Sequence, residues 1–346
     1  MRRTAWLAIV AALVALVAPA AARASDAPGR CPDAAPLATG WYRDAVGGPD
    51  ADWLRFSLDR PRTVVVTLGG LSADARLRLF GGCGTLIATS DRKGAGFEEI
   101  VRRLPAGSYR VGIDAVAAAP SITAYGLRVR VLPQRVVVLS SRAWIEGPNL
   151  RIVGEVLNAT GRTRESVSLR FIFYDAAGEV IPPLDWHTVA QGGLLGPRQR
   201  SMFVLDYAGV PAEYAHYGVL VESAPIARAE PIGGLPVERG PAATDESGTR
   251  VLSGTLRNGN PFPVRDSRVG VTLYDDWGRV LNADFAATRS RADGALAASG
   301  SDPFTISLWS HWADANRIVF RGYGERVREG TPGGPATPGS LRVRTD

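Results

Sequence analysis

The sequence has little of what most enzymes depend on. Its 346 residues include 3 histidines and 2 cysteines, and Lys93 is the only lysine. It contains no G-x-S-x-G elbow, H-E-x-x-H pair, P-loop or G-x-G-x-x-G turn after a strand. His187 and His216 lie beside aromatic residues and are expected to be interfacial or solvated rather than general bases. The sequence therefore predicts a protein that is not an enzyme and needs no cofactor, with an enzyme of unrecognised type as the remaining alternative.

A large excess of one charge is also missing. The chain has 40 Lys and Arg against 34 Asp and Glu. Loss of the first 24 residues would remove 3 arginines and no acid, which leaves 37 against 34. A surplus this small does not call for a nucleic acid or a membrane surface as partner. We therefore expect no nucleic-acid binding, although the sequence pI is about 9.7.

Only one long hydrophobic run is present, and it lies at the N-terminus. Arg2 and Arg3 precede an Ala/Leu/Val run that ends near Pro19, and small residues surround Ala24. This pattern predicts a cleavable signal peptide over residues 1–24. The alternative is an uncleaved anchor, but the run is shorter than the roughly 20 residues that span a bilayer. We expect a secreted or cell-surface protein with no stable membrane span after cleavage.

The C-terminal segment has few apolar residues. Residues 326–346 are rich in Pro and Gly and contain no hydrophobic run. Such a composition cannot supply a core, and it predicts a disordered tail.

The two cysteines, Cys31 and Cys83, are 52 residues apart. An oxidising compartment outside the cytosol favours their pairing. In the chain-entropy model, closing such a loop stabilises a domain by about 4 kcal/mol. The alternative is two free thiols, although no activating group or zinc-type spacing accompanies them.

The sequence repeats itself with an offset of one hundred residues. Between the shared positions the apolar residues also coincide, two residues apart, which is strand spacing. A repeat of this length indicates two copies of a whole β-domain. The shared residues are Gly154/Gly254, Asn158/Asn258, Tyr174/Tyr274, Asp175/Asp275, Gly178/Gly278 and Val180/Val280.

Strand patterns also fill the region before the repeat. Apolar residues alternate with polar ones in Asp52–Leu58, Arg76–Phe80 and Tyr125–Val131, and Thr63–Leu68 is β-branched and too short for a helix. Gly81–Gly84 predicts a hairpin turn between two of these strands. Short strands separated by glycine-rich turns predict a β-sandwich.

Residues 37–132 resemble the bacterial pre-peptidase C-terminal domain. The resemblance rests on Trp53–Phe56, Ala73–Phe80 and Leu104–Tyr109. It implies a jelly-roll-like, non-catalytic module of secreted peptidases and surface proteins, some relatives of which bind calcium and collagen. Cys83 departs from the pattern, because the hairpin usually carries a polar turn residue there.

The two repeats resemble the FxLYD domain, a small secreted β-sandwich. The naming strand reads Phe171–Asp175 in the first copy and Val271–Asp275 in the second, where Val replaces the first aromatic residue. In each copy the Tyr hydroxyl can bond at the sandwich edge, and the Asp can accept turn N–H groups. The following glycine can take a positive φ. We therefore interpret these shared residues as scaffold rather than as a binding site.

Two groups of side chains are candidate ligand contacts. Asp44, Asp50 and Asp52 offer oxygen ligands to calcium, with turn capping and solvation as the simpler alternative. Trp277 at the second hairpin tip, if exposed, could stack on a sugar ring or enter a partner's groove, and the alternative is that it serves only to cover part of the fold. Trp309 and Trp312 could do the same, or could cover the open end of the sandwich.

Together these observations predict an all-β chain of tandem β-sandwiches, one jelly-roll-like and two Ig-like. We expect extracytoplasmic protein binding, adhesion or assembly with an extracellular or envelope protein. Carbohydrate recognition through exposed tryptophans, with a polysaccharide as ligand, is the alternative. The expected units are a signal peptide (1–24), three sandwiches (31–132, 134–224 and 225–325) and a tail (326–346).

Overall fold

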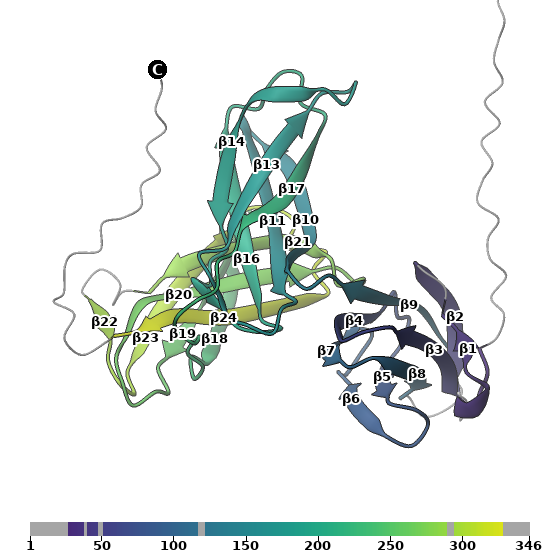
Figure 1. Cartoon of the computed structure of the whole chain (residues 1–346). Coiled ribbons are helices and arrows are strands. Elements are labelled where there is room, and N and C mark those ends of the chain that lie inside the picture. The colour runs from purple at the N-terminus through teal and green to yellow at the C-terminus, as the bar shows by residue number, and fades with distance from the viewer. Residues whose placement is uncertain (1–26, 38–39, 48–50, 117–121, 289–293, 328–346) are drawn as a thin grey trace, which may run out of the picture.

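The structure is a computed structural model that describes residues 27–37, 40–47, 51–116, 122–288 and 294–327. Every regular element in these ranges is a strand, apart from the 3-10 helix η1 (Cys31–Asp33). The predicted all-β fold of tandem β-sandwiches is therefore confirmed (Figure 1). The signal peptide and most of the predicted tail lie outside the described residues, whereas Arg326 still belongs to the last strand. No helix within the described ranges is long and apolar enough to cross a membrane.

The first sandwich consists of two sheets that are antiparallel except at one edge, where the short strand β1 pairs with β3 in parallel. Their strand orders are β1-β3-β8-β5-β6 and β2-β9-β4-β7. Their inward side chains form one core, centred on Leu54, Leu77 and Leu127. The strands are β1 (Ala35–Pro36), β2 (Trp41–Gly47), β3 (Ala51–Leu58), β4 (Arg62–Gly69), β5 (Ala75–Phe80), β6 (Leu86–Ser90), β7 (Glu98–Leu104), β8 (Gly107–Ala115) and β9 (Ile122–Leu132).

The second sandwich faces a three-stranded sheet, β10-β11-β16, with another, β14-β13-β17. Its core gathers Ile152, Phe171, Phe173 and Phe203 from both sheets. The strands are β10 (Val136–Glu146), β11 (Asn149–Asn158), β12 (Arg164–Glu165), β13 (Ser168–Tyr174), β14 (Val180–Val189), β15 (Leu194–Leu195), β16 (Arg200–Ala208) and β17 (His216–Ser223).

The third sandwich repeats that topology. Sheet β18-β19-β23 corresponds to β10-β11-β16, and β21-β20-β24 corresponds to β14-β13-β17. The repeat read from the sequence is therefore a repeat of strand order as well. The strands are β18 (Val237–Thr244), β19 (Arg250–Arg257), β20 (Val264–Tyr274), β21 (Val280–Ala287), β22 (Ala295–Leu296), β23 (Ser301–Leu308) and β24 (Arg317–Arg326).

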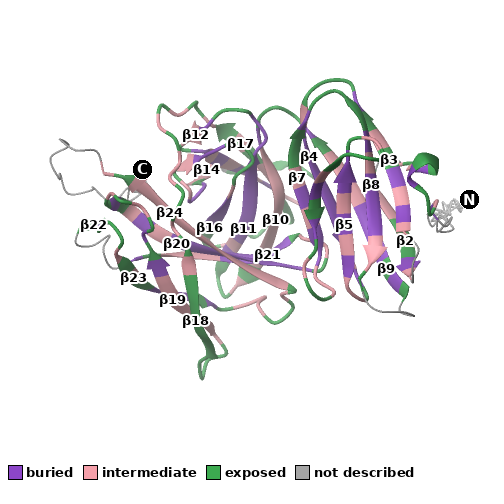
Figure 2. Ribbon diagram, turned by 90° about the horizontal axis from the view of Figure 1, so that it is seen from below, coloured by how far each residue is buried: buried purple, intermediate pink, exposed green. Residues whose placement is uncertain are grey.

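Several strands are buried on both faces because one sandwich packs against the next. In β4 every residue after Arg62 is buried, and in β11 all residues from Ile152 onward are buried (Figure 2). The inner face of β4 joins its own core, while Val65 packs outward against Leu157 of the second sandwich. By contrast, β18 is exposed along almost its whole length. The three sandwiches therefore share extensive apolar interfaces.

Candidate functional site

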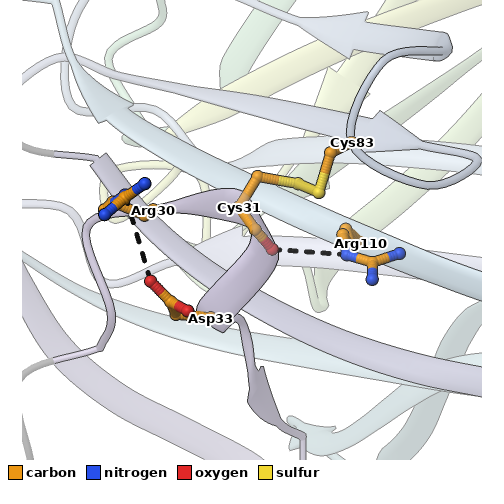
Figure 3. Close-up of a disulfide and its surroundings, with 5 residues drawn as sticks. All are labelled: Arg30, Cys31, Asp33, Cys83 and Arg110. Carbon is orange, nitrogen blue, oxygen red and sulfur yellow. Dashed lines mark hydrogen bonds and ion pairs between the residues drawn. A yellow bond between two sulfur atoms is a disulfide. The ribbon is translucent and has the colours of Figure 1, made fainter.

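Cys31 and Cys83 form a disulfide, as predicted. Their Cα atoms are 5.7 Å apart, and the bond joins η1 to the turn between β5 and β6 (Figure 3). The Cys31 carbonyl also accepts a hydrogen bond of 3.3 Å from Arg110 Nε on β8. The N-terminal segment is thereby fixed to the edge of the first sandwich.

The predicted calcium carboxylates have separate roles. The Asp44 carboxylate accepts hydrogen bonds from Ala27 N at 3.1 Å and from the Tyr42 hydroxyl at 2.6 Å. Asp52 is buried and accepts a 2.6 Å bond from the Tyr125 hydroxyl. Asp50 lies outside the described residues. In the described part of the chain, no three His, Cys, Asp or Glu side chains gather closely enough to hold a metal ion, and calcium stays a prediction.

The alternative in which Trp277 is exposed is wrong, because its side chain is half-buried. Its ring lies against the first sandwich, edge-on to Trp41 with ring centroids 4.8 Å apart. Two glycines make room for it, since a Cβ atom would come within 2.6 Å of the ring at Gly70 and within 2.4 Å at Gly126. Gly70 N also donates a 3.0 Å hydrogen bond to the Asp276 carbonyl of the same tip. The hairpin tip is a docking element inside this chain, because the first sandwich covers part of the Trp277 ring.

Trp309 and Trp312 differ in exposure. Trp309 is 67% exposed, so it does not cover the end of the sandwich. Trp312 is half-buried against the core of the third sandwich, with the Arg250 guanidinium 5.3 Å from its ring centroid. Of these two residues, Trp309 presents the more exposed aromatic face, and ligand contact by either residue stays a prediction.

A buried ion cluster joins all three sandwiches, and we call it the junction cluster: Glu99, Glu155, Arg200, Tyr274 and Arg321. Arg200 on β16 contacts Glu155 at 2.7 Å and Glu99 of the first sandwich at 2.6 Å. Glu155 on β11 is 1% exposed, and its other oxygen accepts a 2.6 Å bond from the Tyr274 hydroxyl of the third sandwich. Arg321 on β24 lies 3.1 Å from that same oxygen.

The electrostatics of the junction cluster keep Glu155, Arg200 and Arg321 charged. Burial raises the pKa of Glu155, but Arg200 and Arg321 outweigh burial and hold that pKa below its usual value. Burial lowers the pKa of Arg200, yet Glu99 and Glu155 more than reverse this and raise it. Removing one member of such a cluster leaves a buried charge without compensation.

An apolar layer surrounds the junction cluster. Phe97 of the first sandwich packs beside Tyr274, with the two rings tilted and their centroids 5.7 Å apart. Val153 and Met202 from the outer face of the β10-β11-β16 sheet pack in the same cluster, together with Ala283 of the third sandwich. The outer faces of two sandwiches, which would otherwise contact water, thus form a second core between domains.

Sequence reasoning missed this junction, although a signal was present. A strand with one wet face alternates apolar and polar residues, while a strand buried on both faces is a continuous apolar run. Met202–Leu205 is such a continuous apolar run. Ile152–Leu157 is also apolar except for Gly154 and Glu155. An acidic residue inside a doubly buried strand needs a partner, which pointed to an arginine from elsewhere.

A small cleft lies at the rim of the same interface, and we call it the tryptophan cleft. It has a volume of about 180 Å³ and is lined by Trp144 of the second sandwich and by Trp309 and Asn282 of the third. Asp284 also lines it and accepts a 2.8 Å bond from Arg151. Burial raises the pKa of Asp284, and Arg151 offsets part of that effect. An exposed ring beside planar polar side chains suits a small polyhydroxylated ligand.

The histidines are engaged in local contacts. His187 Nδ1 lies 2.9 Å from Glu222, and His216 stacks on Tyr174 with ring centroids 4.9 Å apart. His311 meets Trp144 edge-on at 4.9 Å, and its pKa is lowered by burial and by Arg142. These positions agree with structural roles.

Comparisons with known proteins give only distant structural likenesses. No family model matches the chain, and no curated protein matches it. A solved pre-peptidase C-terminal domain of the Bacillus anthracis collagenase is similar at 14% identity, covering 31% of this chain and all of that one, with a TM-score of 0.25. An exo-chitosanase of Amycolatopsis orientalis (18% identity, 69% of this chain, 29% of that one) has a TM-score of 0.31.

A β-galacturonidase of Eisenbergiella tayi (8% identity, 75% of this chain, 35% of that one) has a TM-score of 0.30. This chain thus spans about a third of either glycosidase. All of these scores lie below 0.5, and none assigns a function. A solved pre-peptidase C-terminal domain is thus among the distant likenesses of the chain, while the FxLYD resemblance stays a prediction.

Proposed function

We propose that this chain is an exported, non-catalytic binding protein whose three sandwiches form one fixed platform for an extracellular or envelope protein. The junction cluster carries the proposal, because Arg200 bonds carboxylates of two sandwiches and Glu155 bonds the Tyr274 hydroxyl of the third. A fixed arrangement of the sandwiches holds together any surface to which two of them contribute. Less conformational entropy is then lost when a partner binds. The disulfide is compatible with an oxidising compartment.

Capture of a partner from the native envelope tests this proposal. The bait is the full chain, and the comparison is the double variant Glu155→Gln/Trp277→Ala, which loosens the junction and leaves the three cores intact. We expect the wild type to retain a defined protein and the double variant to lose it, while small-angle scattering shows a wider particle.

The matched control is Ala177→Ser, at the equivalent and uncontacted hairpin tip of the second sandwich. It should retain the partner. Retention by the loosened variant as well would contradict a role for the fixed platform. Turnover of a peptide, ester or glycoside library that is lost in His187→Ala or His216→Ala would contradict the non-catalytic assignment.

A second candidate function, carbohydrate recognition, is favoured by the tryptophan cleft. The exposed Trp309 ring can stack on the apolar face of a sugar, and the side chains of Asn282 and Asp284 lie beside it. On a glycan array, binding should disappear with Trp309→Ala and return in part with Trp309→Phe. Trp312→Phe, outside the cleft, should bind like the wild type, and an array without any signal would remove this candidate.

A further inference from the structure

A larger groove lies on the other side of the interface, and we call it the arginine groove. It has a volume of about 700 Å³ and runs between the Gly192–Arg200 segment of the second sandwich, the Pro231–Arg239 segment, and β24. Two domains and the connection between them therefore build its walls. This composite origin links the groove to the fixed arrangement of the platform.

The charge of the arginine groove is of one sign. Five arginines line it, and none of its lining residues is Asp or Glu: Arg198, Arg200, Arg239, Arg317 and Arg321. The junction carboxylates neutralise Arg200 and Arg321. The other three have no ion pair with a carboxylate of the described residues. Three positive charges thus remain uncompensated along one groove.

Two of these guanidinium groups are held in place. Arg239 donates a 2.8 Å hydrogen bond to the Ile318 carbonyl and lies 5.0 Å from the Phe320 ring centroid. Arg317 is half-buried with its guanidinium 5.2 Å from the Phe97 ring centroid, and burial together with the nearby charge of Arg92 lowers its pKa. A desolvated and uncompensated arginine gains from an anionic partner more than a solvated one does.

The walls of the groove also offer apolar surface. Ile232, Leu235 and Val237 line it and are only half-buried. Along β24 every residue from Arg317 to Glu325 is half-buried, so this edge strand stays open to the groove. A polypeptide ligand can place apolar side chains on this wall and acidic side chains on the arginines. An acidic polysaccharide has no apolar side chains for the wall.

The corresponding side of the second sandwich provides an internal comparison. The groove between β10 and β17, of about 620 Å³, is lined by Arg130, Arg135 and Arg164 but also by Glu222. Glu222 in turn contacts His187 and Arg170. The same topological position is therefore of mixed charge in one copy and purely basic in the other.

We infer that the arginine groove binds an extended acidic segment of a partner polypeptide, through Arg198, Arg239 and Arg317 and the apolar wall beside them. This inference rests on the proposed binding function and names the chemistry of its partner. It predicts a site where affinity depends on three particular arginines, rather than on the overall charge of the chain.

Titration of the full chain with poly-L-glutamate tests the inference, with polygalacturonate as the second probe. The groove variant is Arg198→Ala/Arg239→Ala/Arg317→Ala. The charge-matched control is Arg55→Ala/Arg103→Ala/Arg228→Ala, at three exposed arginines outside the groove. We expect at least tenfold weaker polyglutamate binding in the groove variant, a change within twofold in the control, and weaker binding of all proteins as salt rises.

Equal losses in the two triple variants, or no binding by the wild type, would overturn the inference. Polygalacturonate binding that is tighter than polyglutamate binding, with the same dependence on the groove arginines, would assign the groove to an acidic polysaccharide and overturn the peptide assignment. Unchanged thermal unfolding of both variants confirms that they fold. Because the titration uses only purified chain, its failure leaves the envelope capture result, and thus the platform proposal, standing.

Discussion

The second and third sandwiches share a scaffold but use one end of it differently. In both copies a buried asparagine closes the same turn: Asn158 Nδ2 donates to the carbonyls of Arg162 and Leu195, and Asn258 Nδ2 donates to those of Phe262 and Leu296. Both side chains also accept an N–H from the residue two positions later. The repeated asparagines are scaffold, as the sequence indicated.

The hairpin tips are likewise built in the same way. Asp175 accepts N–H groups from the residues two and four positions later, and so does Asp275. Gly178 and Gly278 follow at φ values of 85° and 70°. The tip conformation is therefore a property of the repeat and is independent of what the tip contacts.

The difference lies in what the tips carry. The third sandwich has Trp277 where the second has the exposed Ala177, and Trp277 docks on the first sandwich. Tyr274 is buried against Glu155, whereas Tyr174 is half-buried beside His216. The same turn therefore ends free in the second sandwich, whereas in the third it contacts the first sandwich through Trp277 and the Asp276 carbonyl.

The largest effect should follow from breaking the junction cluster. Arg200→Met leaves Glu155 and Glu99 without their shared cation, and we expect a loss of about 3–5 kcal/mol in the free energy of unfolding. The equivalent position of the third sandwich is Ser301. Arg200 pairs with Leu157 on β11, and Ser301 pairs with Arg257, the corresponding residue of β19. Urea unfolding of the full chain should show this loss, while Ser301→Ala should stay within about 0.5 kcal/mol. Similar values for both would mean that the cluster adds no stability.

The docking tryptophan should have the next largest effect. Trp277→Ala removes a half-buried ring from its glycine-lined site, and we expect a loss of about 2 kcal/mol, less than for a fully buried tryptophan. The reciprocal change, Ala177→Trp, places the ring on a free tip and should shift stability by no more than about 0.5 kcal/mol. Thermal unfolding of the two variants measures the contrast, and a comparable loss in both would show that the tip matters for its own turn rather than for docking.

The sequence was sufficient for the parts of the fold that depend on short-range patterns. Alternation in Arg76–Phe80 and the glycine turn that follows it define a strand and a hairpin on their own. The two Tyr-Asp-x-x-Gly segments identified the repeat. Each forms the same hairpin turn, and that turn requires Asp and Gly at the same positions in both copies. The disulfide followed from the number of cysteines and the expected compartment.

The site could not be predicted in the same way, because it depends on contacts between domains. The residues next to Trp277 in the sequence do not show whether its ring packs on Gly126 or is exposed to bind a ligand. Likewise the partner of Glu155 comes from β16, and the position of Tyr274 beside it comes from another domain. Continuous apolar runs indicated buried faces, but they contained no information on which domain covers them.

The two scaffold asparagines should have equal effects. Asn158→Ala and Asn258→Ala each remove an amide that donates to at least two carbonyls and accepts one backbone N–H, and we expect each to lower stability by about 1–2 kcal/mol, slightly less than Trp277→Ala. Urea unfolding of the two single variants gives the comparison. A large difference between them would contradict the view that the copies share one scaffold and differ only in their contacts.

A smaller contrast is expected at the repeated tyrosines. Tyr274→Phe removes a hydrogen bond to a charged group, and we expect a loss of about 1.5 kcal/mol. Glu155 retains both of its arginine contacts in that variant, so the effect stays below that of Arg200→Met. Tyr174→Phe should change stability by no more than about 0.5 kcal/mol, because its ring keeps its stacking on His216. Calorimetry on both variants measures the difference, and equal losses would show that the hydroxyl serves the turn in both copies.

The smallest effect should be the dependence of the junction on pH. Arg200 and Arg321 hold the pKa of Glu155 below 4.5 in the folded chain, despite burial. The stabilisation by this group is therefore complete above pH 4.5 and is lost as the pH falls from there through the folded pKa. The third sandwich has Thr255 at the equivalent position, so it contributes no such dependence. The stability difference between the wild type and Glu155→Gln should be constant from pH 7 to 5 and should shrink below pH 4.5, and a difference that does not change with pH would mean that Glu155 is protonated in the junction.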